Sequence, residues 1–157
     1  MGLPPGYELR AATTEDAGGV AACVTAAYEH YVRRNGKVPA PMRDDYVEVI
    51  GAHDVAVVVD GQSEVVAALV VREAEEGFLL DNIAVRPDQQ GTGLGRLLLE
   101  LAEQKARAAG HDSLYLYTQE IMVENQALYE RIGYVEYARR TELGLHRIYM
   151  RKLLTAG

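Results

Sequence analysis

Residues 85–96 decide the fold and read Val85-Arg86-Pro87-Asp88-Gln89-Gln90-Gly91-Thr92-Gly93-Leu94-Gly95-Arg96. A β-branched, strand-like run precedes the glycines, and leucines at helical spacing follow them. Glycines at every second position allow backbone conformations closed to other residues, so several N–H groups can point into one concavity. The free amides and the positive dipole end of the following helix favour an anion there, and Arg96 adds a positive charge. The stretch therefore predicts a loop that binds a pyrophosphate.

Two other glycine motifs do not fit this stretch. A P-loop ends in Gly-Lys-Ser or Gly-Lys-Thr, whereas Gly95 is followed by Arg96 and Leu97. A dinucleotide fingerprint would need its third glycine at Arg96, and it follows the first strand of a fold, not the fourth. A loop that only turns a strand into a helix would explain one or two glycines better than three.

Patterning on both sides of the loop predicts an α+β fold. The fourth strand, the leucine-rich helix up to Gly110 and the fifth strand form a β-α-β unit, so these two strands should be parallel. The pair Gly18-Gly19 leaves open a break in the first helix, which begins with a capping-box pattern at Thr13 and Asp16. The expected strands are Tyr7–Ala12, Val55–Val59, Glu64–Val71, Phe78–Val85, Ser113–Thr118, Tyr134–Arg140 and Leu145–Lys152. The first helix runs from the capping box at Thr13 to Asn35-Gly36, the other helices are Met42–Ile50 and Asn125–Ile132, and turns fall at Asp60-Gly61 and Glu75-Glu76-Gly77.

The size and composition predict one domain over residues 1–157. A chain of 157 residues with 48% hydrophobic and 25% charged residues can form one hydrophobic core without the help of cross-links. The longest apolar run, around Val65–Val71, is too short for a membrane span, and the N-terminal residues lack a basic leader. We therefore expect a cytoplasmic protein with no membrane partner.

The charge and the potential ligand residues exclude several classes. A net charge of -7 repels a phosphate backbone, so we expect no nucleic-acid partner. Any anionic ligand must be bound by local contacts and not by the overall charge. Cys23 is the only cysteine, and the four histidines lack ligand spacing, so we expect no metal. A lone cysteine in a helix is more typical of a small core residue than of a nucleophile.

Two motifs together resemble the GCN5-related N-acetyltransferase (GNAT) family. Gln90 to Gly95 fits the family signature Gln/Arg-x-x-Gly-x-Gly/Ala, and Asn125-Gln126-Ala127-Leu128-Tyr129-Glu130-Arg131-Ile132-Gly133-Tyr134 resembles its C-terminal helix and the following strand. The resemblance covers nearly the whole chain and implies the GNAT fold: a mixed, mostly antiparallel sheet of about seven strands with a parallel fourth and fifth strand, and about four helices. It also implies acetyl-CoA as the acyl donor. The implied donor contacts are the backbone of Asn82, Ile83, Ala84 and Val85 along the pantetheine arm, and Gln90, Gly91, Thr92, Gly93, Leu94, Gly95 and Arg96 around the pyrophosphate.

Asn125 and Tyr129 are four residues apart on a helix, so both side chains can meet one ligand. The resemblance implies that Asn125 binds the cofactor and that Tyr129 binds it too and acts as the general acid for the departing thiolate. Ordinary packing is the alternative for Tyr129 in a chain with ten tyrosines, and a helix N-cap is the alternative for Asn125.

The implied reaction is direct attack by a neutral amine on the thioester, with an oxyanion met by a backbone N–H near Ala84 or Val85. Asp81 and Glu120 are the candidate general bases, although either can be a solvated surface charge, and water can act instead.

The acceptor is a primary amine that the sequence does not identify. Candidates for its pocket wall are Tyr28, Tyr31, Tyr46 and Tyr137, although ordinary packing explains these tyrosines equally well. A non-catalytic acyl-CoA sensor and a nucleotide-phosphate enzyme are the alternative functions, and the resemblance leaves room for a homodimer.

Overall fold

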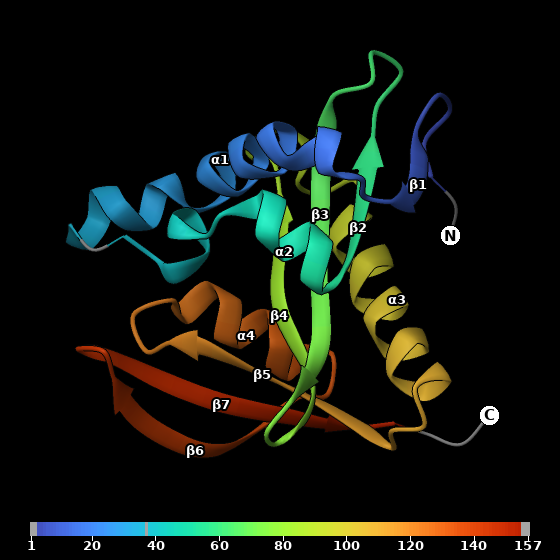
Figure 1. Ribbon diagram of the computed structural model, residues 1–157. Helices are drawn as coiled ribbons and strands as arrows, with labels where there is room; N and C mark the ends of the chain where they lie inside the picture. Colours follow the sequence, from blue (N-terminus) through green and yellow to red (C-terminus); the bar gives the residue numbers. More distant parts are fainter. Residues whose placement is uncertain (1–2, 37, 155–157) are drawn as a thin grey trace. The chain divides into compact units, whose positions relative to one another are not determined.

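The computed structural model describes residues 3–36 and 38–154. Within them lie four α-helices and a seven-stranded mixed sheet with strand order β1-β2-β3-β4-β5-β7-β6 (Figure 1). The predicted α+β class and the expected parallel pairing of the fourth and fifth strands are confirmed. The chain divides into two compact units, one formed by residues up to 71 with 82–101 and the other by 72–81 with the residues from 102 onward.

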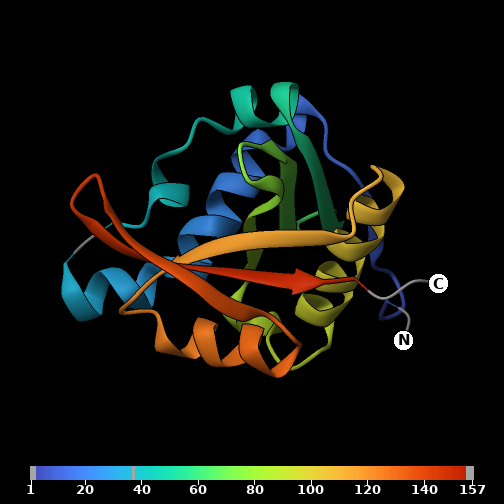
Figure 2. The same ribbon diagram turned by 90° about the horizontal axis from the view of Figure 1, so that it is seen from below.

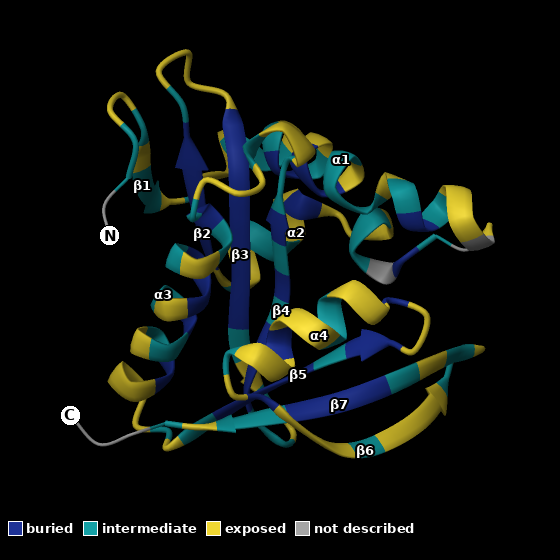
Figure 3. Ribbon diagram, turned by 180° about the vertical axis from the view of Figure 1, so that it is seen from behind, coloured by how far each residue is buried: buried dark blue, intermediate teal, exposed yellow. Residues whose placement is uncertain are grey.

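The first unit contains the strands β1 and β2 with the adjoining half of β3. β1 pairs antiparallel with β2, with Leu9 opposite Val58, and β2 pairs antiparallel with β3, with Val55 opposite Val70. Helices α1 and α2 cover one face of these strands and the start of α3 covers the other (Figures 1 and 3). The bounds are β1 Glu8–Ala11, α1 Ala17–Asn35, α2 Tyr46–Ala52, β2 Asp54–Val59, β3 Val65–Ala74, β4 Gly77–Val85 and α3 Leu94–Ala108.

The second unit is built on the C-terminal strands. β5 runs parallel to β4, with Phe78 opposite Leu114, and antiparallel to β7, with Leu116 opposite Met150. β6 and β7 form a long twisted hairpin beside β5 (Figure 2). The bounds are β5 Ser113–Gln119, α4 Val123–Arg131, β6 Val135–Glu142 and β7 Leu145–Leu153.

The core of the first unit is a valine-rich layer between α1 and the sheet. β2 and β3 are buried along most of their length because their β-branched side chains have cover on both faces (Figure 3). Each fully buried valine contributes about 1.5 kcal/mol from removal of apolar surface from water. The cluster consists of Val20, Cys23, Val24, Tyr46, Val57, Val59, Val65, Ala68 and Ala84.

The glycine pair in the first helix has a packing role. α1 runs unbroken from Ala17, so a break at Gly18-Gly19 does not occur. A Cβ added at Gly19 would lie 2.8 Å from Cγ2 of Val65, which is closer than real Cβ contacts allow. Gly19 therefore lets α1 approach β3, and this contact offsets its poor helix propensity.

One local expectation was wrong. A short 3-10 helix, Ala40–Arg43, stands where the helix over Met42–Ile50 was expected to begin, and α2 starts only at Tyr46 because the Asp45 carboxylate accepts a hydrogen bond from the amide of Val47 (3.0 Å). The turn expected at Asp60-Gly61 does join β2 and β3: the amide of Ser63 donates to the carbonyl of Asp60 (3.0 Å), and Ser63 itself is left-handed (φ 61°).

One face of the C-terminal strands is a stack of tyrosine rings and guanidinium groups. The guanidinium carbon of Arg147 lies 4.6 Å from the ring centre of Tyr117, and that of Arg140 lies 4.3 Å from the ring centre of Tyr149. The hydroxyl of Tyr149 donates to Glu142 (2.7 Å). Successive side chains of β5 and β7 point to opposite faces of the sheet, so these tyrosines lie on one face and the apolar core side chains on the other.

The Arg10–Asp16 pair gives a testable pH dependence. Arg10 donates two hydrogen bonds to Asp16 (2.8 and 3.0 Å), and these, with the Thr13 amide, hold the pKa of Asp16 at about 2 although partial burial acts in the other direction. A lowered pKa stabilises the fold at neutral pH, and this contribution is lost as the pH falls through the folded-state value.

We expect Asp16→Asn to lower the free energy of unfolding by about 1–2 kcal/mol at pH 7. The difference from wild type should shrink between pH of about 4 and 2, as measured by urea unfolding at a series of pH values. A difference that stays constant down to pH 2 would contradict this account.

Candidate active site

The loop between β4 and α3 exposes amide groups through its glycines. Gly91 (φ 82°) and Gly93 (φ 89°) both adopt the left-handed conformation that glycine accommodates without strain. The amide of Leu97 makes the bond that opens α3, to the carbonyl of Gly93 (3.0 Å). The amides of Leu94, Gly95 and Arg96 therefore precede the hydrogen-bonded part of the helix and are available to an anion.

The third glycine serves a different purpose. Gly95 does not have a positive φ, and a Cβ added there would lie 3.8 Å from Cγ2 of Val85, at ordinary van der Waals distance. This position therefore tolerates a small side chain next to β4, whereas Gly91 and Gly93 are required by backbone conformation.

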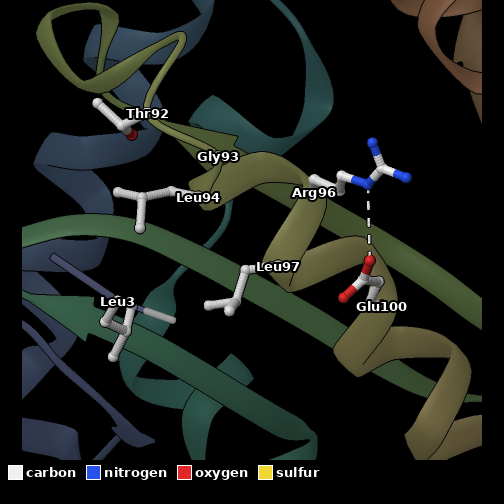
Figure 4. Close-up of a pocket in the computed structure, with 7 residues that line it drawn as sticks. All are labelled: Leu3, Thr92, Gly93, Leu94, Arg96, Leu97 and Glu100. Atoms are coloured by element: carbon white, nitrogen blue, oxygen red, sulfur yellow. Dashed lines mark ion pairs between the residues drawn. The ribbon is translucent and has the colours of Figure 1, made fainter. Parts of the chain in front are cut away.

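A shallow pocket borders this loop (Figure 4). The side chains of Leu3, Leu94 and Leu97 lie on one side of the helix start and give the pocket an apolar wall, while Arg96 points the other way. The pocket is lined by Leu3, Thr92, Gly93, Leu94, Arg96, Leu97 and Glu100.

Arg96 supplies less positive charge to the loop than its sequence position indicates. Its side chain is 73% exposed, and its Nε lies 3.6 Å from a carboxylate oxygen of Glu100, one turn along α3. Exposed pairs of this kind contribute little energy, but the carboxylate offsets the field of the guanidinium. The backbone amides are thus the main electrostatic feature of the loop.

The end of β4 next to the loop is anchored by its side chains. Ala84 packs in the cluster with α1, and Val85 approaches Gly95 of α3, so successive side chains alternate between the two faces. Asn82 is only 6% exposed, and its carboxamide is hydrogen-bonded to Tyr28 and Tyr46. The sequence did not indicate this contact, because Tyr28 and Tyr46 were only candidates for the wall of an acceptor pocket, with ordinary packing as the alternative.

Cys23 is a core residue, as predicted. It is fully buried, with Sγ 4.0 Å from the carbonyl oxygen of Ala84. Burial raises the pKa of the Cys23 thiol to about 11, so the thiol stays protonated at neutral pH.

In the second unit, α4 carries Asn125 and Tyr129 one turn apart. The helix begins at Val123 with Met122 as N-cap, so the N-cap interpretation of Asn125 is wrong. The carboxamide Nδ2 of Asn125 lies 3.9 Å from Sδ of Met122. The Tyr129 side chain is 6% exposed, and its ring meets the ring of Tyr134 edge-on at 5.7 Å between centres.

The two candidate bases belong to the second unit and both have arginine partners. Asp81 accepts a hydrogen bond from Nε of Arg72 (3.1 Å) and is largely shielded from solvent. Glu120 is half exposed, with its carboxylate 3.8 Å from Arg139. Asp81 is thus committed to its partner, while Glu120 is more accessible to water.

The predicted site residues therefore fall into two groups. The first unit brings together Asn82–Val85 and the loop Gln90–Arg96, and the second contains Asp81, Glu120, Asn125 and Tyr129. Gln126 has a structural role that no sequence pattern indicates: its carboxamide donates to the carbonyls of Gln119 (3.2 Å) and Glu120 (2.8 Å) and fixes the connection between β5 and α4.

Among residues 3–36 and 38–154, no cluster of histidine, cysteine, aspartate and glutamate side chains is arranged to hold a metal ion. No helix in the same described ranges is long and apolar enough to cross a membrane.

A strand, a glycine loop and a helix whose first amides have no partner within the helix thus follow one another in a chain that forms a seven-stranded mixed sheet. A sequence model of the GNAT acetyltransferase domain matches residues 51–136, which include both the loop and α4. The chain therefore belongs to the GNAT family of acetyltransferases. No curated protein sequence is significantly similar to it.

Solved structures of acetyltransferases share the fold. A nourseothricin acetyltransferase is 21% identical, with a TM-score of 0.73 over 96% of this chain and 99% of that chain. The ribosomal-protein-S18-alanine N-acetyltransferase from Escherichia coli is also 21% identical, with a TM-score of 0.73 over 96% of each chain. The PaiA N-acetyltransferase from Thermoplasma acidophilum, solved in complex with coenzyme A, is 15% identical, with a TM-score of 0.75 over 94% of this chain and 98% of that chain.

Proposed function

We propose that this protein transfers the acetyl group of acetyl-CoA to a primary amine of a small molecule or a protein. The observation that carries the proposal is the loop Gln90–Arg96, where two left-handed glycines and the start of α3 leave amides free for a diphosphate. Membership of the GNAT family and the coenzyme A bound to the related PaiA enzyme support acetyl-CoA as the donor. In this proposal the backbone of Asn82–Val85 lies along the pantetheine arm.

The donor binds through short-range contacts and not through the overall field. The net charge of -7 opposes an anionic ligand, and Glu100 offsets Arg96 at the loop itself. Amide hydrogens act over hydrogen-bond distance, where long-range repulsion is largely screened by salt. The same acidic surface favours a cationic amine as acceptor.

The reaction we propose is direct transfer. The neutral amine attacks the thioester carbonyl, a C–N bond forms, and an N–H group near Ala84 or Val85 stabilises the oxyanion. The C–S bond then breaks, and the hydroxyl of Tyr129 donates its proton to the thiolate of coenzyme A. Cys23 takes no part, because it is fully buried and protonated.

The amine must lose a proton before or during attack. Asp81 and Glu120 remain the proposed acceptors, directly or through water. Since Asp81 is bound to Arg72 and Glu120 is half exposed, a water-mediated route through Glu120 needs the smaller rearrangement.

The acceptor remains open within the class of amines. The related enzymes are named for nourseothricin and for the alanine of ribosomal protein S18, so one fold serves both a small molecule and a protein. A cytoplasmic location and a homodimer are part of the proposal.

Tyr129→Phe should lower the turnover number at least tenfold and leave the dissociation constant for acetyl-CoA within about twofold of wild type, because only the acidic proton is lost. The measurement is release of the coenzyme A thiol with nourseothricin, a peptide with N-terminal alanine and spermidine as acceptors, alongside titration of acetyl-CoA.

Tyr134→Phe is the matched control for Tyr129→Phe. Its hydroxyl is buried and has no hydrogen-bond partner among the described residues, so the substitution should preserve turnover. Unchanged turnover in Tyr129→Phe would remove Tyr129 from the mechanism, and tight binding of acetyl-CoA by wild type without turnover on any amine would favour a sensor.

Gly93→Ala should weaken acetyl-CoA binding about tenfold, because a side chain at φ 89° strains the loop by about 1 kcal/mol or more and shifts its amides. Gly95→Ala is the control and should bind within about twofold of wild type, since its Cβ meets Val85 at ordinary distance. Calorimetric titration measures both, and equal affinities for the two variants would contradict the proposed role of the loop.

A further inference from the structure

The carboxamide of Asn82 is held between two tyrosines that come from different helices. Tyr28 of α1 donates its hydroxyl proton toward Oδ1 of Asn82 (3.0 Å) and also lies 3.2 Å from the carbonyl oxygen of Ile83. Nδ2 of Asn82 donates to the hydroxyl oxygen of Tyr46, the first residue of α2 (3.1 Å). The hydroxyl of Tyr46 donates in turn to the carbonyl of Pro41 (2.6 Å). We call Tyr28, Tyr46, Asn82 and the Pro41 carbonyl the Asn82 bracket.

Hydrogen-bond chemistry fixes the direction of every link in the bracket. A backbone carbonyl can only accept, so the single proton of Tyr46 goes to Pro41 and its oxygen is left to accept. The group of Asn82 that faces Tyr46 must therefore be the amide nitrogen, which turns Oδ1 toward Tyr28. The carboxamide of Asn82 offers a donor and an acceptor on one short side chain, and the bracket uses both.

The bracket joins the two segments that the proposed reaction must align. Pro41 lies in the connection between α1 and α2. These two helices carry Tyr28 and Tyr46, candidates for the wall of the acceptor pocket, and Asn82 begins the stretch of β4 proposed for the donor. Asn82 and Tyr46 are 6% and 4% exposed, so these links are shielded from competition by water. The hydroxyl of Tyr28 also contacts the backbone carbonyl of Ile83, so the bracket holds the backbone of β4 as well as the side chain of Asn82.

We propose that Tyr28, Tyr46 and Asn82 are positioning residues that hold β4 in the geometry required for acetyl transfer and tie it to the connection between α1 and α2. This role rests on the proposed function, because it presumes that β4 holds the donor thioester. The bracket residues lie outside the loop Gln90–Arg96 proposed for the diphosphate, so they should govern turnover and leave donor affinity almost unchanged.

The test is a double-mutant cycle between Tyr46 and Asn82. Tyr46→Phe keeps the ring and removes the link to Asn82 and Pro41, and Asn82→Ala removes the carboxamide. Each should lower turnover about tenfold with the acceptor of the panel that gives the highest rate, while the dissociation constant for acetyl-CoA stays within about twofold of wild type. The double variant should match the single ones within about twofold, since both changes break the same unit.

Tyr149→Phe is the matched control, because it too removes a hydrogen bond from a buried tyrosine, in this case to Glu142. It should leave turnover within about twofold of wild type. If Asn82→Ala fails to fold in thermal unfolding, the pair Tyr46→Phe and Tyr28→Phe provides the same cycle.

Turnover equal to wild type in both Tyr46→Phe and Asn82→Ala would overturn the positioning role. A double variant whose loss of turnover is the product of the two single losses would also overturn it, as would an equally large loss of turnover in Tyr149→Phe. Absence of turnover in the wild type with all three acceptors would instead reject the proposed function, and the positioning role with it.

Discussion

The amide hydrogens at the start of α3 are the feature on which the rest of the site depends. They have no partner within the helix, because the first amides of an α-helix lack a carbonyl four residues earlier in it. They lie close together because Gly91 and Gly93 adopt left-handed conformations immediately before the helix. The arrangement needs a rigid strand before the loop and a long helix after it. β4 provides the strand and α3, with its leucine face, provides the helix.

The charges of the protein explain why, in our proposal, binding of the anionic donor depends on short-range hydrogen bonds. The protein is acidic, and Arg96, the cation nearest the free amides along the chain, is exposed and paired with Glu100. Neither the overall charge nor that arginine can concentrate an anionic donor at the loop. In our proposal the placement of backbone amides does so. The adjacent strand is held in place by hydrogen bonds from the buried Asn82 to Tyr28 and Tyr46.

The sequence predicted the elements well where periodicity and glycine chemistry act locally. The seven strands, the parallel pair and the loop follow from β-branched runs, leucine spacing and glycines at every second position. It failed where a single side chain outweighs the pattern, because the Asp45 carboxylate caps α2 and delays its start to Tyr46. Contacts such as Tyr28 to Asn82 join residues far apart in the chain, and no spacing rule indicates them. The roles of Tyr129, Asp81 and Glu120 still rest on family resemblance and on chemistry.

The central claim is that the free amides between Gly91 and Arg96 bind the diphosphate of coenzyme A. Titration of ¹⁵N-labelled protein with coenzyme A, followed by amide chemical shifts, tests it directly. We expect the largest saturable shifts at residues 91–96, because a hydrogen bond to phosphate deshields the amide proton. Binding of coenzyme A that leaves these resonances unmoved, with the shifts confined to other segments, would contradict the account.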